Sequence, residues 1–503
     1  DDGCAPNGGS IYYGAEISTD MTNAKRTGYT FVGWYEDEAY QTEWSGTTMP
    51  ARDLTLYAKW DVMTYFLRFD WDGNVPLRDW LLENGGKLLT AAYDEENGVY
   101  SNANDHGIPY IDVSVAYDQV FTLPTGIPGA EYFGYYKEEQ NEYGSYESLV
   151  KSESLTKMAE EQDAIVKVGV QWKSEPDNNG TEQLYNANDF LTKVVQDSAY
   201  EAASYALGVD LDLCNVNMKY NGDIVDGITF DGNNHTIFNV KRGEMIANCA
   251  AGSIYGYGDS VTVKNLTIDG MTVDYTAAVD SFSNEYHAFG ALAGFVGDGF
   301  NAENVTVTHV TMNLNLLGEK GNAYNSAHLL PAECIGGLIG YAKGSVTLTD
   351  CNVEDLTVNV TDKNDSGGTQ FLIGGLIGYA DALYTQIPGE NEYSSSNDYN
   401  GNGSVTITGC TVLDMTVDKN GATGASVGGF LGGIGKHIVS KTGATYSVTT
   451  TIDEVSAFPE GFESIGKELT INDSTGSNST AQSLDAIPAA AFEGESDEEN
   501  TAA

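Results

Sequence analysis

Apolar and polar residues alternate strictly in short segments between residues 260 and 432, which predicts strands with one buried face. A pattern of Ser or Asn followed by Val-Thr-apolar recurs at residues 260–263, 304–307, 345–348 and 404–407. Glycine-flanked apolar segments alternate with it, at residues 290–294, 336–340, 374–378 and 428–432. Segments that return at a period of a few tens of residues indicate a solenoid, in which each coil buries its apolar face against its neighbours.

Aligning these segments gives columns of like residues, which favour a parallel β-helix over a β-sandwich, because a sandwich has no reason to repeat a residue at one offset. One column holds Val261, Val305, Val346 and Val405, and another holds Leu266, Val310, Cys351 and Cys410. Glycines at the corners would supply positive φ and close backbone approach. The structural repeat glycines are Gly337, Gly340, Gly375, Gly378, Gly429 and Gly432.

The β-helix is predicted over residues 201–460. Residues 175–200 before it read as a linker with a capping helix that begins at Asn186, a suitable N-cap residue. Residues 461–503 after it read as an acidic low-complexity tail or spacer, with one last strand at Leu469–Ile471.

The N-terminal region is richer in aromatic residues. In residues 1–61, two alternating runs, Gly28–Tyr35 and Leu54–Trp60, predict two strands whose rings, Trp34 and Trp60 among them, form the core of a small module. Residues 62–174 resemble a degenerate and expanded copy, with an opening strand at Tyr65–Asp70. In this copy Tyr135 would replace Trp34 and Trp172 would match Trp60, with an insertion at residues 76–118 and a helix at residues 148–162.

The motifs Gly-Tyr-Thr-Phe-x-Gly-Trp-Tyr and Leu-Tyr-Ala-Lys-Trp resemble the Listeria–Bacteroides repeat, also called the internalin B-repeat, a β-grasp-like module of bacterial surface proteins. The family opens with a strand that ends in a Gly-Gly turn. Only the turn, at Asn7–Gly9, is evident here, so the first strand is expected to be lost by truncation or supplied by a neighbouring domain.

Two further motifs, Phe230-Asp231-Gly232 through Ile237 and the Gly-Gly-Leu-Ile-Gly segments, resemble the GLUG repeat of right-handed β-helix proteins. Together the resemblances imply a mainly β chain in which β-grasp-like modules precede a right-handed parallel β-helix.

The charge and the cysteine content of the chain exclude several classes of partner and of metal site. The 503 residues include 24 basic and 73 acidic side chains, for a net charge of −49, which argues against nucleic-acid and anionic-membrane partners. No apolar run is long enough to span a membrane. The six cysteines form no Cys-x-x-Cys pair, so a zinc site is not expected; Cys351 and Cys410 read as buried apolar residues, with a stacked disulfide as the alternative. No cofactor is predicted with certainty, but the many oxygen ligands favour structural calcium.

Candidate catalytic groups are sparse. Glycoside hydrolysis needs two carboxylates, and Asp210, Asp212 and Asp231 are candidates, but they occupy positions typical of turns and caps. His235 is expected to make a structural hydrogen bond, while His287 and His328 could lie near each other. The chain is therefore predicted not to be an enzyme, with a carbohydrate-active β-helix lyase or hydrolase as the alternative.

Polar insertions provide the predicted binding surface. Three of them, at residues 275–286, 318–331 and 361–369, interrupt the pattern at the same point and should project from one edge. The fourth, residues 381–403, carries the predicted ligand-binding residues Tyr384, Tyr393 and Tyr399.

These observations predict a non-catalytic bacterial protein that is extracellular, secreted or attached to the cell wall. Its expected role is adhesion or surface structure, with a host or environmental glycan or protein as ligand. A third reading is a filament subunit that pairs with other copies of itself or with cell-wall components by strand addition at an open edge beside residues 10–16.

Overall fold

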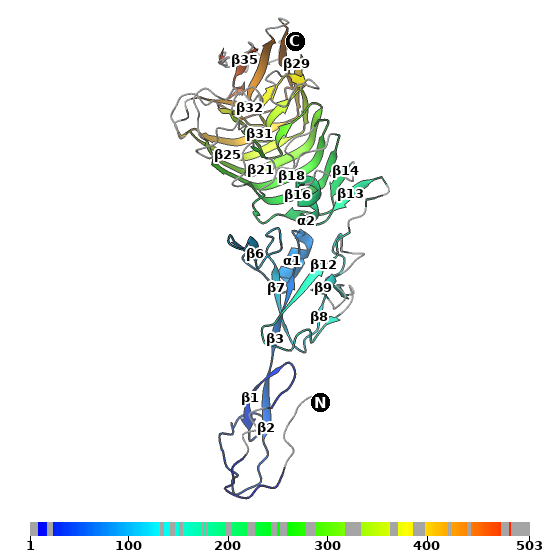
Figure 1. Cartoon of the computed structure of the whole chain (residues 1–503), viewed down its shortest axis with the longest axis vertical. Coiled ribbons are helices and arrows are strands. Elements are labelled where there is room, and N and C mark those ends of the chain that lie inside the picture. Colours follow the sequence, from blue (N-terminus) through cyan, green and yellow to red (C-terminus); the bar gives the residue numbers. More distant parts are fainter. Residues whose placement is uncertain are drawn as a thin grey trace, which may run out of the picture. The chain divides into compact units, whose positions relative to one another are not determined.

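The computed structural model describes residues 9–17, 24–130, 135–140, 146–149, 154–173, 176–177, 179–196, 204–218, 227–242, 249–251, 259–276, 287–316, 333–362, 371–385, 398–420, 422, 424–439, 444–473 and 482–483. These residues form two compact units. The first comprises residues 1–71 and 76–172, and the second, which we call the stacked unit, comprises residues 72–75 and 173–503. Both are built mainly from strands, as predicted (Figure 1).

The first unit begins with the predicted aromatic module. Its strands β1 (Tyr29–Tyr35) and β2 (Tyr57–Val62) pair antiparallel. The ring of Phe31 meets Trp34 and Trp60 edge-on, at centroid distances of 5.5 and 5.3 Å. These rings remain half-buried, and among residues 9–17 and 24–62 only Gly28 is fully buried.

The rest of the first unit contains a six-stranded sheet, as far as the chain is described, in the order β10-β9-β12-β3-β7-β4. The central strand β3 lies where the opening strand was predicted and buries Tyr65, Leu67 and Phe69. It pairs parallel with β12 and antiparallel with β7. The bounds are β3 (Thr64–Phe69), β4 (Gly86–Leu88), β7 (Ile111–Ala116), β9 (Tyr135–Gln140), β10 (Tyr146–Leu149) and β12 (Ile165–Val170).

Smaller strand pairs and contacts complete this unit. The pairs are β5 (Ala92–Asp94) with β6 (Val99–Ser101) and β8 (Phe121–Thr122) with β11 (Ser154–Leu155). The aromatic module joins the six-stranded sheet through Tyr29, whose hydroxyl donates to Asp118 Oδ2 at 2.8 Å.

The prediction of a helix at residues 148–162 is wrong. The described residues there belong to β10 and β11 or to turns, whereas the helix of this region is α1 (Val75–Glu83), inside the predicted insertion. Pro76 suits the first helical turn, and Leu77 and Leu81, four residues apart, are fully buried on one face. Residues 148–162 are mostly polar and lack such a face.

The stacked unit contains a 22-stranded sheet within the described residues. Its long strands pair parallel in successive rows, which we call rungs, and Figure 1 shows them lying one above the next. Their interior positions repeat, as in the fully or almost fully buried column Met271, Val310, Leu356 and Met415. The rungs are β16 (Thr229–Arg242), β18 (Thr262–Thr276), β21 (Phe300–Leu316), β24 (Ser345–Thr349) with β25 (Asn352–Asp362), and β30 (Gly403–Thr408) with β31 (Thr411–Asp418).

The glycine-flanked segments form a second series of parallel strands in the same sheet. We also call the strands of this second series rungs. Buried residues occupy both faces of these strands, in contrast to the alternation seen in the first series. The series comprises β17 (Cys249–Ala251), β19 (His287–Gly290), β20 (Ala293–Val296), β22 (Glu333–Gly336), β23 (Ile339–Lys343), β26 (Phe371–Gly374), β27 (Ile377–Asp381) and β32 (Ala425–Val439).

Both predicted columns are wrong at β21, where Val310 lies beside Met271 and not beside Leu266. Val305 lies beside Leu266 and not beside Val261, and Ala302 takes the place beside Val263. Apolar residues still face inward after this change of register, because a corner residue in the left-handed backbone conformation separates the two straight segments of each rung. That corner falls at Asn265 (φ 54°) and Asn304 (φ 52°), one residue before the aligned valine or leucine. The alternation is similar on both sides of the corner, so the sequence pattern fits either side.

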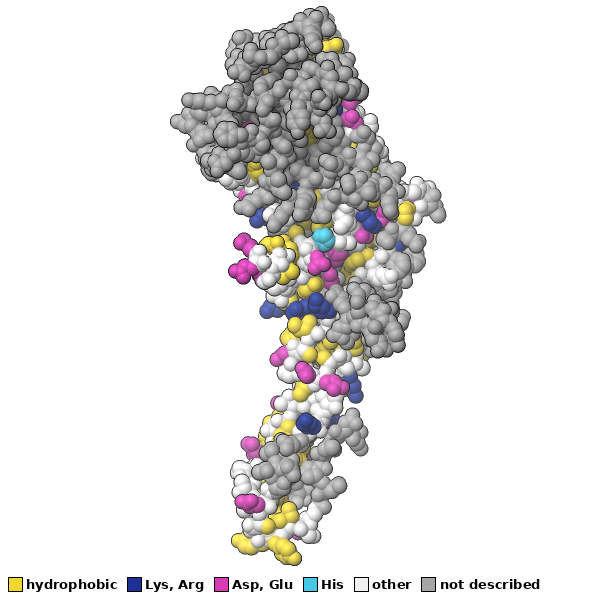
Figure 2. All heavy atoms as spheres, in the orientation of Figure 1, with side chains coloured by type: hydrophobic (Ala, Val, Ile, Leu, Met, Phe, Trp, Pro, Cys, Tyr) yellow, Lys and Arg dark blue, Asp and Glu magenta, His cyan; other side chains and the backbone are white. Residues whose placement is uncertain are grey.

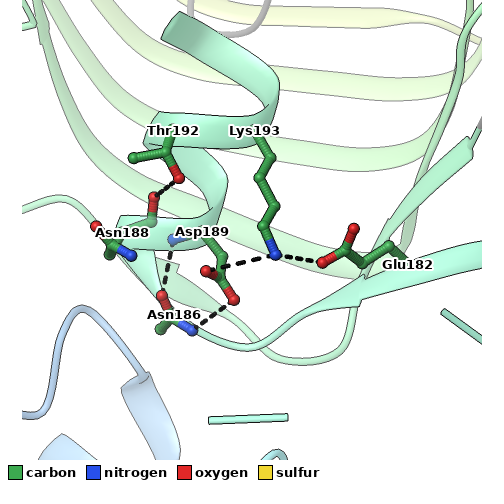
Figure 3. A network of polar contacts seen from close by, with 6 residues as sticks. All are labelled: Glu182, Asn186, Asn188, Asp189, Thr192 and Lys193. Atoms are coloured by element: carbon green, nitrogen blue, oxygen red, sulfur yellow. Dashed lines mark hydrogen bonds and ion pairs between the residues drawn. The ribbon is translucent and has the colours of Figure 1, made fainter. Parts of the chain in front are cut away.

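Residues 175–200 are also more than a linker. Strand β13 (Thr181–Leu184) pairs parallel with β14 (Ser204–Leu207), so it is part of the large sheet. The predicted helix is present as α2 (Ala187–Phe190), which continues as a π-helical turn at Leu191–Gln196. Asn186 is its N-cap, and Asn186 Oδ1 accepts from the Asp189 amide at 2.8 Å (Figure 3).

Polar contacts attach this helix to β13. Lys193 forms an ion pair with Glu182 of β13, and its ammonium lies 3.6 Å from Asp189 one turn earlier (Figure 3). Burial disfavours the charged ammonium, but the contacts with Glu182 and Asp189 outweigh it and raise the pKa of Lys193. The helix also buries Phe190 and Val194.

Residues 72–75 cover an edge within the stacked unit. The carbonyl of Asp72 accepts from Ala187 N at 2.7 Å, and that of Gly73 accepts from Asp212 N at 2.8 Å. Asn74, fully buried, lies opposite Leu211 of β15 (Leu211–Asp212) in an antiparallel bridge. Backbone groups that an end strand would expose are paired in this way.

The large sheet extends into the region predicted to be a tail. After β33 (Thr445–Ile452), the sheet continues in that region with β34 (Glu463–Ile465), β35 (Glu468–Asp473) and β36 (Gln482–Ser483). The last strand predicted at Leu469–Ile471 is therefore confirmed within β35, and the boundary at residue 461 is wrong. Ile465 and Leu469 are fully buried, which explains why these segments remain in the sheet.

Candidate functional site

Three insertions leave the stacked unit at one edge, as predicted. The strands before them end in register, with Thr276 beside Asn315 and Asn315 beside Thr361. The strands after them also begin in register, with Ala288 beside Cys334 and Cys334 beside Leu372. The inserted residues themselves, 277–286, 317–332 and 363–370, lie outside the described part of the chain.

The fourth insertion begins at Asp381 and contains the predicted binding tyrosines. Its strands β28 (Leu383–Thr385) and β29 (Asp398–Gly401) pair antiparallel, with Tyr384 opposite Tyr399. We call residues 381–385 with 398–403 the Asp381 hairpin. Two of the three predicted binding residues are thus brought together at backbone level, whereas Tyr393 lies outside the described residues.

A buried carboxylate fixes the start of this hairpin. Asp381 is fully buried, and its Oδ2 accepts from the Tyr341 hydroxyl at 3.0 Å while its Oδ1 accepts from the Ala382 amide at 2.8 Å. Its carbonyl accepts from Gly344 N at 3.0 Å. A buried charge with several hydrogen bonds strongly favours one local geometry, because losing any partner is costly.

Neighbouring rungs close around this carboxylate. Lys343 lies beside Asp381 in register, and its ammonium is 3.7 Å from Asp259 Oδ1. On the next rung, a Cβ added at Gly435 would lie 2.3 Å from Asp381 Oδ1. The base of the hairpin is therefore close-packed, which suits it to hold a binding loop in place.

An aromatic ladder continues this base. The ring of Tyr341 stacks on Phe295 at a centroid distance of 4.6 Å and meets Tyr379 at 5.8 Å. All three are buried or nearly so, so the ladder supports the hairpin and offers no exposed platform.

Five of the six predicted repeat glycines sit where a side chain would meet the backbone of a neighbouring rung, and at Gly429 it would meet the ring of Phe458 at 2.2 Å. A Cβ at Gly375, for example, would lie 2.1 Å from the Gly429 carbonyl oxygen, and one at Gly378 would lie 2.4 Å from Ile335 N. Comparable distances to backbone atoms are 2.0 Å at Gly337, 2.5 Å at Gly340 and 2.3 Å at Gly432. None of the six has a positive φ, so that part of the prediction is wrong, and close packing is the physical reason for glycine at these positions.

Of the three carboxylates weighed for catalysis, Asp212 and Asp231 cap turns, and Asp210 accepts from the backbone of β16. Asp212 Oδ1 accepts from Cys214 N, and Asp210 Oδ1 accepts from Thr236 N, both at 2.8 Å. Asp231 Oδ1 accepts from Asn233 N at 2.9 Å, and Asp231 Oδ2 lies 3.2 Å from Lys264 Nζ. Burial opposes ionisation of Asp231, but these bonds prevail and lower its pKa. His235 makes the expected structural contact, with its Nδ1 3.0 Å from Asp210 Oδ1.

One titratable pair was not predicted from the sequence. His309 Nδ1 lies 2.8 Å from Asp269 Oδ1, 40 positions earlier in the chain, on the exposed side of adjacent rungs. The hydrogen bond to Asp269, followed by the charges of Asp269, Asp355 and Glu354, raises the pKa of His309. Only the register of the rungs brings these residues together. The two histidines predicted to lie near each other are not described to that level: His287 is described only at the backbone, and His328 lies outside the described residues.

Within the described ranges, no three His, Cys, Asp or Glu side chains converge in an arrangement suited to a metal ion. None of the helices described here has the length and apolar character to cross a bilayer.

Comparison with known proteins finds a relationship at the N-terminus. Residues 1–59 match the Listeria-Bacteroides repeat domain. Internalin H of Listeria monocytogenes is 41% identical over 102 residues, which is 18% of this chain and 19% of that protein. A putative membrane protein of Evansella cellulosilytica is 31% identical over 99 residues, 18% of this chain and 15% of that protein. No solved structure matches.

The repeat match covers β1 and the first half of β2 and ends at Lys59, before the six-stranded sheet begins. The chain spans about a fifth or less of the length of these curated relatives. The similarity therefore establishes a Listeria–Bacteroides repeat module at the N-terminus and leaves the stacked unit to be interpreted from its own geometry.

Proposed function

We propose that this chain is the extracellular part of a bacterial cell-surface protein that binds its ligand without chemical turnover, as an adhesin. The repeat module supports a surface location, because one relative is an internalin and another is named a putative membrane protein. The parallel register of the rungs and the glycine contacts support a right-handed β-helix of the GLUG type as the scaffold for binding loops.

The observation that carries this proposal is the Asp381 hairpin. Tyr384 and Tyr399 occupy opposite positions in it, and a fully buried Asp381 fixes its origin. Tyrosine offers a large apolar ring and a polar hydroxyl at a small cost in conformational entropy, which suits recognition of a glycan or protein surface. Proteins commonly place binding residues on loops that a rigid scaffold holds.

The test compares two tyrosine pairs in the same chain. Tyr93 and Tyr100 also face each other across a two-stranded pair, β5 with β6, with a ring centroid distance of 4.8 Å. The full chain, a Tyr384→Ala/Tyr399→Ala variant and a Tyr93→Ala/Tyr100→Ala variant would be applied to a glycan array and to immobilised extracellular proteins. We expect the first variant to lose at least about tenfold in affinity, as for two interface anchor residues, and the second to bind normally.

The same samples test the alternatives. Release of oligosaccharides from any polysaccharide would overturn the non-catalytic proposal and favour a carbohydrate-active enzyme. Equal binding by both variants would remove the ligand from the hairpin and direct attention to the first unit, where hydrophobic side chains gather at the end of the aromatic module in Figure 2. In the same module, Tyr12 and Tyr13 are 90% and 78% exposed.

Filament assembly has less support. It requires an open strand edge beside residues 10–16, but residues 14–17 already hydrogen-bond with residues 47–49. We retain calcium as a proposed structural cofactor, and each binding assay would be run with calcium and with a chelator. A chelator-sensitive melting temperature would support it, and an unchanged one would remove it.

A further inference from the structure

Cys351 and Cys410 lie directly beside each other on adjacent parallel rungs. The next residues, Asn352 and Thr411, are register partners, and Thr411 N donates to the Cys351 carbonyl at 3.0 Å. Register partners in a parallel sheet are about 4.8 Å apart. That separation falls inside the Cα–Cα range of disulfides, about 4.4–6.8 Å.

The two sulfur atoms also lie close to each other's rung. Cys351 N donates to Cys410 Sγ at 3.4 Å, so this sulfur is against the backbone of its partner cysteine. Both side chains take the same course, because each Sγ donates at 3.4 Å to the carbonyl two residues earlier, of Thr349 or Thr408. Both residues are fully buried, so no other chain can compete for either thiol in the folded state.

The two thiols differ in acidity. The hydrogen bond with Cys410 and then burial raise the pKa of Cys351 well above its ordinary value, whereas the hydrogen bond from Cys351 lowers the pKa of Cys410. Cys410 is therefore the thiol that ionises first and reacts first with an oxidant.

We propose that Cys351 and Cys410 are oxidised to a disulfide that joins two adjacent rungs of the stacked unit. The oxidant is a low-molecular-weight disulfide. The Cys410 thiolate attacks one of its sulfur atoms, which breaks the S–S bond and releases one thiolate. Cys351 then gives up its proton to solvent and attacks Cys410 Sγ in the mixed disulfide, releasing a second thiolate. The oxidant gains two electrons as two thiols, and the protein loses two thiol hydrogens.

The cross-link would have a mechanical role around the Asp381 hairpin. The loop that it closes contains residues 352–409, including the whole Asp381 hairpin. Cross-linking this loop would hold the two rungs that flank the hairpin together when a bound ligand is pulled. An extracellular location, as proposed above, supplies the oxidising conditions in which disulfides persist. The disulfide does not depend on the hairpin being the binding site.

Another buried cysteine provides a matched control. Cys334 is also fully buried within the sheet, but its register partners are Ala288 and Leu372. The same oxidant should leave Cys334 as a thiol.

The first experiment maps the cysteines in the full chain. The full chain would be refolded from denaturant in the presence of oxidised glutathione, denatured again without reductant in the presence of an alkylating agent, and digested for mass spectrometry. We expect a peptide pair joined through Cys351 and Cys410, together with alkylated Cys334. Recovery of Cys351 and Cys410 as alkylated thiols after this treatment would overturn the proposal.

A second measurement separates the cross-link from a folding defect. Reduction should lower the melting temperature of the oxidised wild type and of a Cys334→Ala variant by about 3–10 °C, as expected for closing a long loop. A Cys351→Val/Cys410→Val variant should show no effect of reductant, and valine suits the column because Val305 precedes Thr306, the register partner of Asn352, one rung earlier. An equal effect of reductant on this variant would contradict the assigned pair.

Discussion

The Listeria–Bacteroides repeat module and the stacked unit solve the problem of a small core in different ways. In residues 9–17 and 24–62 of the module only Gly28 is buried, and Trp34 and Trp60 contact Phe31 while remaining half-exposed. In the stacked unit, interior columns such as Val307 and Val353 are fully buried on every rung. The difference teaches that repetition, by letting each rung cover the previous one, buries small aliphatic side chains that a short module cannot bury.

The largest expected effect comes from closing the space between rungs. Gly375→Ala would place a methyl group 2.1 Å from the Gly429 carbonyl oxygen, so the rungs must separate. We expect a loss of more than about 4 kcal/mol in stability, or failure to fold, measured by chemical denaturation of the full chain. The control is Gly9→Ala in the module, where no atom lies within 4 Å of the new methyl group, and it should change stability by less than about 0.5 kcal/mol. Equal stability of the two variants would contradict the close approach of the rungs.

A pair of core truncations sharpens the comparison. Leu356 is fully buried, and Leu356→Ala should lower the free energy of unfolding by about 2–5 kcal/mol, because the rungs above and below prevent collapse of the cavity. Phe31→Ala in the module should cost less than the usual 3–5 kcal/mol for a buried phenylalanine, since its ring is only half-buried. Unfolding of each unit would be followed separately by hydrogen exchange. A larger loss in the module than in the stacked unit would reverse our account of the two cores.

Acid should weaken the stacked unit through Asp231. The pKa of its carboxyl is lowered in the fold, so its contribution is present above the unfolded value of 3.8 and is lost as pH falls through the folded value. Asp231→Asn should therefore lower the free energy of unfolding by about 1 kcal/mol at pH 7, and the difference should disappear once the Asp231 carboxyl is protonated in both the folded and the unfolded protein. Denaturation curves across this pH range would test it, and a constant difference between wild type and variant would exclude the ionised form as the cause.

The smallest effect is expected at His309, on the exposed side of the rungs. Its pKa is raised by Asp269, so the pair stabilises the fold fully below pH 6.5 and loses this contribution as pH rises through the folded value. The histidine should titrate above 6.5 by NMR, and Asp269→Asn should bring that value down. An unchanged titration in the variant would show that other charges, such as Asp355, set the pKa.

The sequence predicted local features better than their lateral positions. Alternation and the spacing of Gly337 and Gly340 suffice to predict strands and corners, because both follow from the chain's own geometry. The register of Val305 could not be predicted from the sequence, because the segments on either side of a corner have the same alternation. The pairing of His309 with Asp269 was likewise not predictable, because it depends on the length of a complete turn between rungs.

The candidate site was predicted only in part. Tyr384 and Tyr399 were singled out because they lie in a polar insertion, and the strands place them opposite each other. The buried base formed by Asp381, Tyr341 and Lys343 was missed, since an acidic chain with many tyrosines gives no signal for which of them are enclosed. Burial of a charge is decided by neighbours on other rungs, and these are distant in sequence.

Residues 72–75 have a consequence for how the protein is made. They pair with Leu211 and Asp212 at an early strand of the stack, yet they leave the ribosome before any strand of that stack. The nascent chain therefore already holds the piece that completes the first layer when that layer emerges. Each later layer then finds a finished template on one side, so assembly has a starting point and a direction, from the N-terminal end toward the C-terminal end.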